Sequence, residues 1–126
     1  MKPLVHKKVK RVRQKPVVRW KLSVTKGDLV QVISGDDKGV RARVLRVNPK
    51  NGRVTLEGVN VVKRHRRATQ TTESGIIEFP APIHHSKVML LDPKSGAPSR
   101  VRRRVDKDGT VERIAVRSGE PIPRTR

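Results

Sequence analysis

The chain has 126 residues, a length that favours one domain with extensions over two independent domains. Its formal net charge is +20, from 31 Lys and Arg against 11 Asp and Glu. A folded protein with this excess is expected to lie against a polyanion that offsets its self-repulsion. The chain has no cysteine, which excludes disulfides, thiolate zinc sites and cysteine nucleophiles. It also has neither a membrane-spanning apolar run nor a secretory signal pattern, so an intracellular, soluble protein is expected.

The first part of the chain, residues 1–21, carries nine Lys or Arg and no acid. Val5, Val9 and Val12 are spaced as on one face of a short helix, which Pro16 would end. The alternative is a basic tail that is disordered in solution, and both alternatives permit ordering on RNA. The candidate phosphate-contacting residues of this tail are Lys7, Lys8, Lys10, Arg11 and Arg13.

Strand patterns begin after the tail, and residues 22–62 are expected to form a small barrel. An apolar, β-branched run at 29–33 is followed by turn residues at 34–39. In the next strand the apolar residues alternate with Arg41 and Arg43, which places cations on the open face.

The alternation slips at Val44 and Leu45, which predicts a β-bulge of the kind that curls a small barrel. Residues 48–52 predict a hairpin loop, and Val54 and Leu56 supply the inner face of the next strand. The expected core consists of Leu29, Val30, Val32, Ile33, Val44, Leu45, Val47, Val54, Leu56, Val59, Val61 and their neighbours.

The second half of the chain is less regular. Residues 63–85 fit neither strand nor helix periodicity, and we expect an extended basic loop there. Residues 86–119 predict a C-terminal β region, in which the Asp108-Gly109 pair joins the two strands of a hairpin. Residues 120–126 are expected to form a tail. Short strands, Gly-rich turns and the lack of a long helix together indicate an all-β fold.

Two segments resemble a known family. Lys26 to Val44 resembles a KOW motif, whose turn glycines would be Gly27, Gly35 and Gly39. Taken alone, such a hairpin is weak evidence, and an ordinary structural turn explains it better. Val54 to His65 then follows at the spacing seen in bacterial-type ribosomal protein L-twenty-four, and later blocks of that family occur in the same order. These blocks are residues 74–78, 81–84 and 86–93, together with Gly96, Arg100-Val101, the Asp108-Gly109 turn and Arg113.

The resemblance implies an SH3-like barrel with a small additional β region, a long projecting loop and a basic N-terminal tail. It implies a structural constituent of the large ribosomal subunit that binds the 5′-proximal part of large-subunit rRNA early in assembly, beside neighbouring ribosomal proteins. The loop around residues 66–84 would lie near the mouth of the polypeptide exit tunnel. A cytoplasmic ribosome is expected, and an organellar one stays open.

This sequence departs from the family pattern at a few positions. Ala42 stands where a KOW motif usually has glycine, so its φ is expected to be negative or strained. Ser74-Gly75, Phe79-Pro80 and Lys87 also replace the usual residues, and the tail is longer than the common form. The shape of the loop tip therefore does not follow from the resemblance.

Outside the tail, the candidate RNA-binding residues are mostly cations in or beside the expected strands. They are Lys26, Lys38, Arg41, Arg43, Lys63, Arg64, His65, Arg66, Arg67, Lys87, Arg100, Arg102 and Arg104. The block from Lys63 to Arg67 could alternatively be a solvated charge run. On a strand, Arg102 and Arg104 should share one face and Arg103 the other. His65, His84 and His85 lack the spacing of a metal site, and no metal or other cofactor is expected.

Other functions fit the sequence less well. It contains no catalytic triad, paired acids or phosphate-loop motif, so neither an enzyme nor a small-molecule substrate is expected. A transcription-elongation KOW module would need a further domain ahead of Lys26, where only 25 residues stand. A general polyanion-binding protein remains an alternative on charge alone. Because Trp20 and Phe79 are the only large aromatic residues, base stacking is not expected to be the main mode of RNA recognition.

Overall fold

The computed structural model describes residues 16–125, and the fold is all-β as expected. Its centre is a five-stranded antiparallel sheet with the strand order β6-β3-β2-β1-β7. The strands of this barrel are β1 (Leu29–Val32), β2 (Arg41–Asn48), β3 (Arg53–Leu56), β6 (Ile83–His84) and β7 (Val88–Leu90), with a short 3₁₀ helix, η1 (His85–Lys87), before β7. No helix in this part of the chain is long and apolar enough to cross a membrane.

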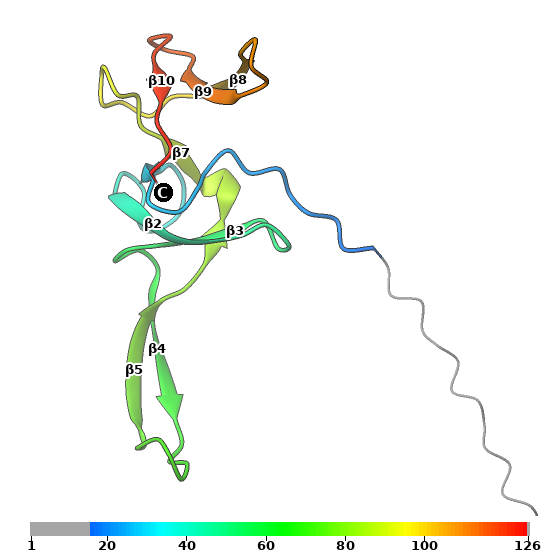
Figure 1. Ribbon diagram of the computed structural model, residues 1–126. Coiled ribbons are helices and arrows are strands. Elements are labelled where there is room, and N and C mark those ends of the chain that lie inside the picture. The colour runs from blue at the N-terminus through cyan, green and yellow to red at the C-terminus, as the bar shows by residue number, and fades with distance from the viewer. Residues whose placement is uncertain (1–15, 126) are drawn as a thin grey trace, which may run out of the picture.

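Two smaller sheets extend from the barrel on opposite sides (Figure 1). One is a hairpin of β4 (Val61–Arg66) and β5 (Gly75–Pro80). The other has the order β10-β9-β8 and consists of β8 (Val101–Val105), β9 (Val111–Ala115) and β10 (Pro121–Ile122).

The sheet register explains how the barrel curls. The pairing of β2 with β3 shifts between Val44 and Arg46, which is the bulge that the sequence predicts. Leu45 lies at this shift and is 41% exposed, so its expectation as a core residue is wrong. The extra residue in a bulge turns a side chain that would otherwise point inward toward solvent.

The hydrophobic core differs from the expected one in two ways. Some residues expected in it are exposed, and residues from the C-terminal part of the chain belong to it. Leu29 and Val61 are exposed, contrary to expectation, whereas Val88, Leu90, Ala115 and Ile122 join the core. Among residues 16–125, the hydrophobic core consists of Val24, Val30, Val32, Ala42, Val44, Val54, Leu56, Val59, Val88, Leu90, Ala115 and Ile122. The C-terminal strands therefore close the core of the barrel.

Two expected boundaries are drawn differently in the structure. The segment 63–85, expected to be an irregular loop, contains most of the paired β4–β5 hairpin and all of β6. The segment 120–126, expected to be a tail, contributes β10, and Ile122 is buried. In addition, β7 pairs with β1 of the barrel, so it does not belong to the C-terminal sheet.

A buried ion pair joins the barrel to the C-terminal sheet. Arg113 of β9 is 2% exposed and Asp28, just before β1, is 4% exposed. The guanidinium donates to both carboxylate oxygens, with Nη2 3.1 Å from Oδ1. It also donates to the carbonyls of Ser23 (3.0 Å) and Pro123 (2.9 Å), so one side chain holds three segments together.

The turn between β1 and β2 contains two glycines with positive φ angles. Gly35 has φ +100° and Gly39 has φ +90°, and Gly39 N donates to Val32 O at 2.7 Å. A side chain at either position would be strained because L-residues rarely adopt these angles. Ala42 is not among the described residues with positive φ, so this substitution of the usual glycine needs no left-handed backbone.

The same turn fixes the base of the β4–β5 hairpin. Asp37 Oδ2 accepts a hydrogen bond from Asn60 N at 2.9 Å. Asn60 has φ +54°, an angle that Asn adopts more readily than most residues. Asn60 also closes the two ends of the hairpin, since its Nδ2 donates to Ala81 O at 3.3 Å and its carbonyl accepts from Ala81 N at 2.9 Å.

Candidate nucleic-acid interface

Every candidate cation in the described part of the chain is exposed to solvent. They lie on all three sheets and on the turns between them, so they do not form one compact cluster. Lys7, Lys8, Lys10, Arg11 and Arg13, and the helix considered around Val5 to Val12, lie outside the described residues.

The barrel carries its cations on the outer face of β2. Arg41 and Arg43 alternate with the buried Ala42 and Val44, as the sequence predicts. Arg41 Nε donates to Gln31 Oε1 at 3.3 Å on the neighbouring strand β1. Lys26 and Lys38 lie in the turns before and after β1, and Lys87 lies in η1.

Cross-strand partners project from the same side of a sheet, so the register of the β4–β5 hairpin divides its side chains between two faces. These two faces differ in charge. One face, here called the arginine face, has Arg64 paired with Ile77 and Arg66 paired with Gly75. Val62 and Phe79 lie opposite each other at its base, and this face has no acid.

The opposite face, here called the lysine face, is partly neutralised. Lys63 lies across from Glu78, and Lys63 Nζ is 3.4 Å from Glu78 Oε1. His65 and the 61% exposed Ile76 complete this face toward the tip. The five-residue block from Lys63 to Arg67 is therefore divided between two surfaces.

The C-terminal sheet offers fewer free cations than its sequence indicates. Arg102 and Arg104 pair with Ile114 and Glu112 on one face of β8, whereas Arg103 pairs with Arg113 on the other. Arg104 contacts Glu112 (2.8 Å) and Asp106 (3.4 Å), so much of its charge is already matched. Arg100 immediately precedes β8 and is exposed.

A loop carboxylate connects this sheet to the end of β7. Asp92 is buried and accepts from Ser118 Oγ at 2.6 Å, from Ser95 Oγ at 2.9 Å and from Lys94 N at 3.1 Å. The hydrogen bond from Ser118, reinforced by those from Lys94 and Ser95, lowers the pKa of Asp92 below its usual value. The stability that this carboxylate contributes is therefore present above its unfolded pKa and is lost as pH falls through the folded one.

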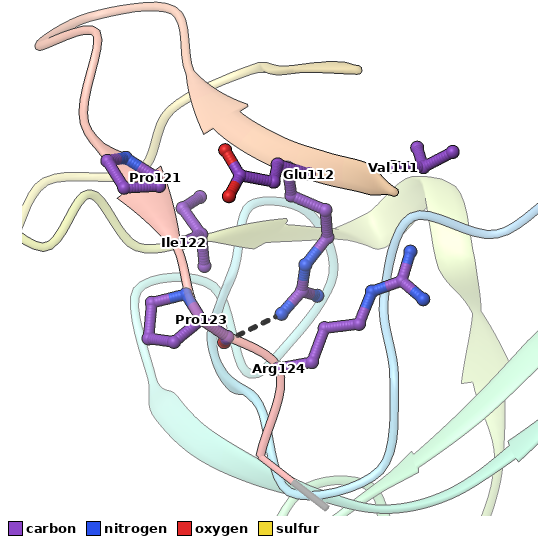
Figure 2. A pocket seen from close by; sticks show the side chains of 7 residues that line it. Val111, Glu112, Pro121, Ile122, Pro123 and Arg124 are labelled. Atoms are coloured by element: carbon purple, nitrogen blue, oxygen red, sulfur yellow. Dashed lines mark hydrogen bonds between the residues drawn. The ribbon is translucent and has the colours of Figure 1, made fainter. Parts of the chain in front are cut away.

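An open hollow lies beside the C-terminal sheet (Figure 2). Val111, Pro121, Ile122, Pro123 and Arg124 line it, and the dashed line marks the hydrogen bond that Pro123 O accepts from Arg113. The hollow holds no set of nucleophile, acid and base. Within residues 16–125, no group of three or more His, Cys, Asp or Glu could hold a metal ion.

Comparison with known proteins matches both parts of the chain. Residues 26–57 match the KOW motif, and residues 59–122 match the family described as "Large ribosomal subunit protein uL24, C-terminal domain". A protein of Rhodospirillum rubrum, described as "Large ribosomal subunit protein uL24", is 52% identical over 99 residues, which cover 79% of this chain and 93% of that protein.

The chain belongs to the uL24 family.

Membership in uL24 confirms the family resemblance and the expected KOW fold. It also makes this chain a structural constituent of the large ribosomal subunit, in a family without enzymatic activity. The two matched segments meet between β3 and β4, which is where the turn-bound Asn60 connects the barrel to the hairpin.

Sequence reasoning missed several exposed cations on the barrel of this uL24 chain. Arg46, Lys50 and Arg53 are all exposed, and they follow Lys38, Arg41 and Arg43 in a run without acids from residue 38 to 56. The absence of acids across the whole run was the signal that could have identified them. Arg46 lies beyond the bulge, where the simple alternation ends, so periodicity alone does not place it on the open face.

Proposed function

We propose that this uL24 chain binds large-subunit rRNA through phosphate contacts made by the barrel and the arginine face of the hairpin. The observation that carries the proposal is the exposed, acid-free run of six cations from Lys38 to Arg53 on a chain with a net charge of +20. Phosphate contacts by Lys and Arg fix the position of a protein on RNA without reading bases. Recognition then comes from the shape that the barrel and hairpin present together.

The family resemblance extends this proposal to a place in the subunit. The 5′-proximal part of large-subunit rRNA is the proposed partner, bound early in assembly, with neighbouring ribosomal proteins alongside. The β4–β5 hairpin is proposed to project near the mouth of the polypeptide exit tunnel. Its reach beyond the barrel supports this assignment (Figure 1).

Co-sedimentation tests the proposal directly. The chain should pellet with large ribosomal subunits through a high-salt wash, because shape complementarity and neutral hydrogen bonds on a folded rRNA site persist where salt weakens the phosphate contacts. A general polyanion-binding protein would be released by the wash and would pellet equally with unrelated RNA. Release under these conditions would contradict the proposed function.

A charge-matched pair of substitutions tests the hairpin. Arg64→Gln on the arginine face should weaken binding to cognate rRNA by about tenfold, the loss of one charge-assisted hydrogen bond. Lys63→Gln removes the same charge one residue away, and it should change affinity by less than about twofold because Glu78 already matches this lysine. Filter binding or calorimetry at constant salt measures both. Equal losses in the two variants would mean that the faces do not differ in function.

A further inference from the structure

The one tryptophan of the chain lies in an aromatic cluster that the sequence does not indicate. The ring centroids of Trp20 and His84 are 5.4 Å apart with perpendicular planes, and those of Trp20 and His85 are 5.3 Å apart. His84 and His85 are themselves 4.4 Å apart. The cluster joins the segment before β1 to the end of β6, more than sixty residues later.

Backbone contacts fix this cluster on the turn between β2 and β3. Trp20 N donates to Pro49 O at 2.8 Å. A Cβ at Gly52 would lie 3.0 Å from Cγ and 3.1 Å from Cδ1 and Cδ2 of Trp20, so the indole lies directly on this glycine. The carbonyl of Gly52 accepts from both N and Nδ1 of His85, each at 2.9 Å. The indole is therefore held in place before any ligand arrives.

The indole nevertheless remains accessible. Trp20 is 50% exposed although one face of its ring contacts Gly52. A large aromatic residue that is half exposed and whose backbone is fixed can accept a flat partner at little cost in side-chain entropy.

The electrostatic surroundings favour a nucleic acid as that partner. The three segments that build the cluster, residues 16–27, 46–56 and 79–91, contain no Asp or Glu. Arg19 and Lys21 flank Trp20, Lys50 and Arg53 flank Gly52, and all four are exposed. Arg53 also lies opposite His84 in the pairing of β3 with β6.

We propose that Trp20, supported by His84 and His85, is a stacking platform for one unpaired RNA base. Arg19, Lys21, Lys50 and Arg53 hold the phosphates on either side of that base. Such a combination of an aromatic face and surrounding cations is the general means by which proteins bind unpaired nucleotides. The inference rests on the proposed function as an rRNA-binding protein, and it adds a site and a ligand class to it.

The single tryptophan makes the site directly observable. Fluorescence of the full-length chain is followed during titration with a short oligouridylate, and with an abasic oligomer of the same length and charge. Stacking should quench and shift the emission with the oligouridylate and leave it nearly unchanged with the abasic oligomer. An equal response to both, or no response to either, would overturn the stacking platform.

Two variants separate stacking from structure. Trp20→Leu should weaken oligouridylate binding roughly 5-fold or more, the lower end of what one stacked base contributes, whereas Trp20→Phe should retain most of the affinity. The same proteins are then tested on cognate rRNA. If the wild-type chain binds rRNA but neither oligomer changes its fluorescence, the stacking platform alone is refuted. If the wild-type chain does not bind rRNA, the proposed function is refuted as well. Quenching that appears only when ribosomal proteins are added would assign the indole to a protein partner and would overturn the base-stacking proposal.

Discussion

Replacing Arg113 by methionine should lower the free energy of unfolding by about 3–5 kcal/mol, the usual cost of leaving one member of a buried ion pair alone. Methionine preserves much of the side-chain volume, so the loss reports the polar groups that Arg113 no longer satisfies, above all the carboxylate of Asp28, which keeps only its hydrogen bonds from Thr25. The substitution also leaves the carbonyls of Ser23 and Pro123 without their donor. A loss of this size would approach the whole stability of a small domain.

Urea unfolding followed by far-UV circular dichroism measures this effect. Arg103→Met is the matched control, because Arg103 lies directly across β8 and β9 from Arg113 and is exposed. It should change stability by no more than about 0.5 kcal/mol. The double variant Asp28→Leu with Arg113→Met should recover only part of the loss. It removes the unpaired charge, but Thr25 N and Thr25 Oγ1 lose their acceptor and two carbonyls stay without a donor. A cost below about 1 kcal/mol for Arg113→Met would show that the pair does not hold the two sheets together.

Deleting residues 1–15 should make the affinity for rRNA much less sensitive to salt. The deletion removes seven Lys or Arg and no acid. Each neutralised phosphate releases counterions, so seven lost contacts would flatten the log–log salt slope by up to about 5 units. At roughly 50 mM salt the affinity should fall by orders of magnitude, and at high salt the two proteins should converge.

The deletion should leave the preference for cognate rRNA over an unrelated duplex nearly intact, because phosphate contacts position a protein without specifying sequence. It retains Trp20 and its anchoring turn, so the proposed stacking platform is unaffected. The variant for comparison replaces Arg64, Arg66 and Arg67 by Gln. It should lose the preference for cognate rRNA while keeping most of the salt slope. The division between tail and hairpin would be wrong if the deletion removed the preference and the hairpin variant kept it.

Local turn chemistry explains how much of the fold the sequence predicts. The bulge after Val44 and the Asp108-Gly109 turn appear where the residues indicate them, because both depend on a few neighbouring positions. The sequence does not indicate the hairpin at 61–80, since β4 (VVKRHR) and β5 (GIIEFP) lack an alternating pattern and neither strand has a buried face. Without a buried face, no hydrophobic period distinguishes such strands from a loop.

Contacts between distant segments explain most of the remaining differences. Leu29 looks like a core residue in its own strand, yet its side chain lies on the outer face of β1, and Ile122 from the far end of the chain is buried instead. Alternation with buried residues predicts the exposure of Arg41 and Arg43, and charge alone indicates the other candidate cations. Their division between two hairpin faces, and the meeting of Trp20 with His84 and His85, depend on the register of β4 with β5 and on the path of the chain before β1.

The hydrogen bond between Asp37 and Asn60 attaches the base of the hairpin to the turn of the KOW motif, so the hairpin and the barrel change orientation together. Six residue pairs at about 3.4 Å each make the paired part of the hairpin about 20 Å long. A tilt of the hairpin by about 10° at its base then displaces the far end of the paired strands by about 3.5 Å, more than the length of a hydrogen bond. The orientation in which the barrel binds RNA therefore sets the position of the hairpin tip. A small change in the angle of the barrel on RNA becomes a large displacement of the contacts at the tip.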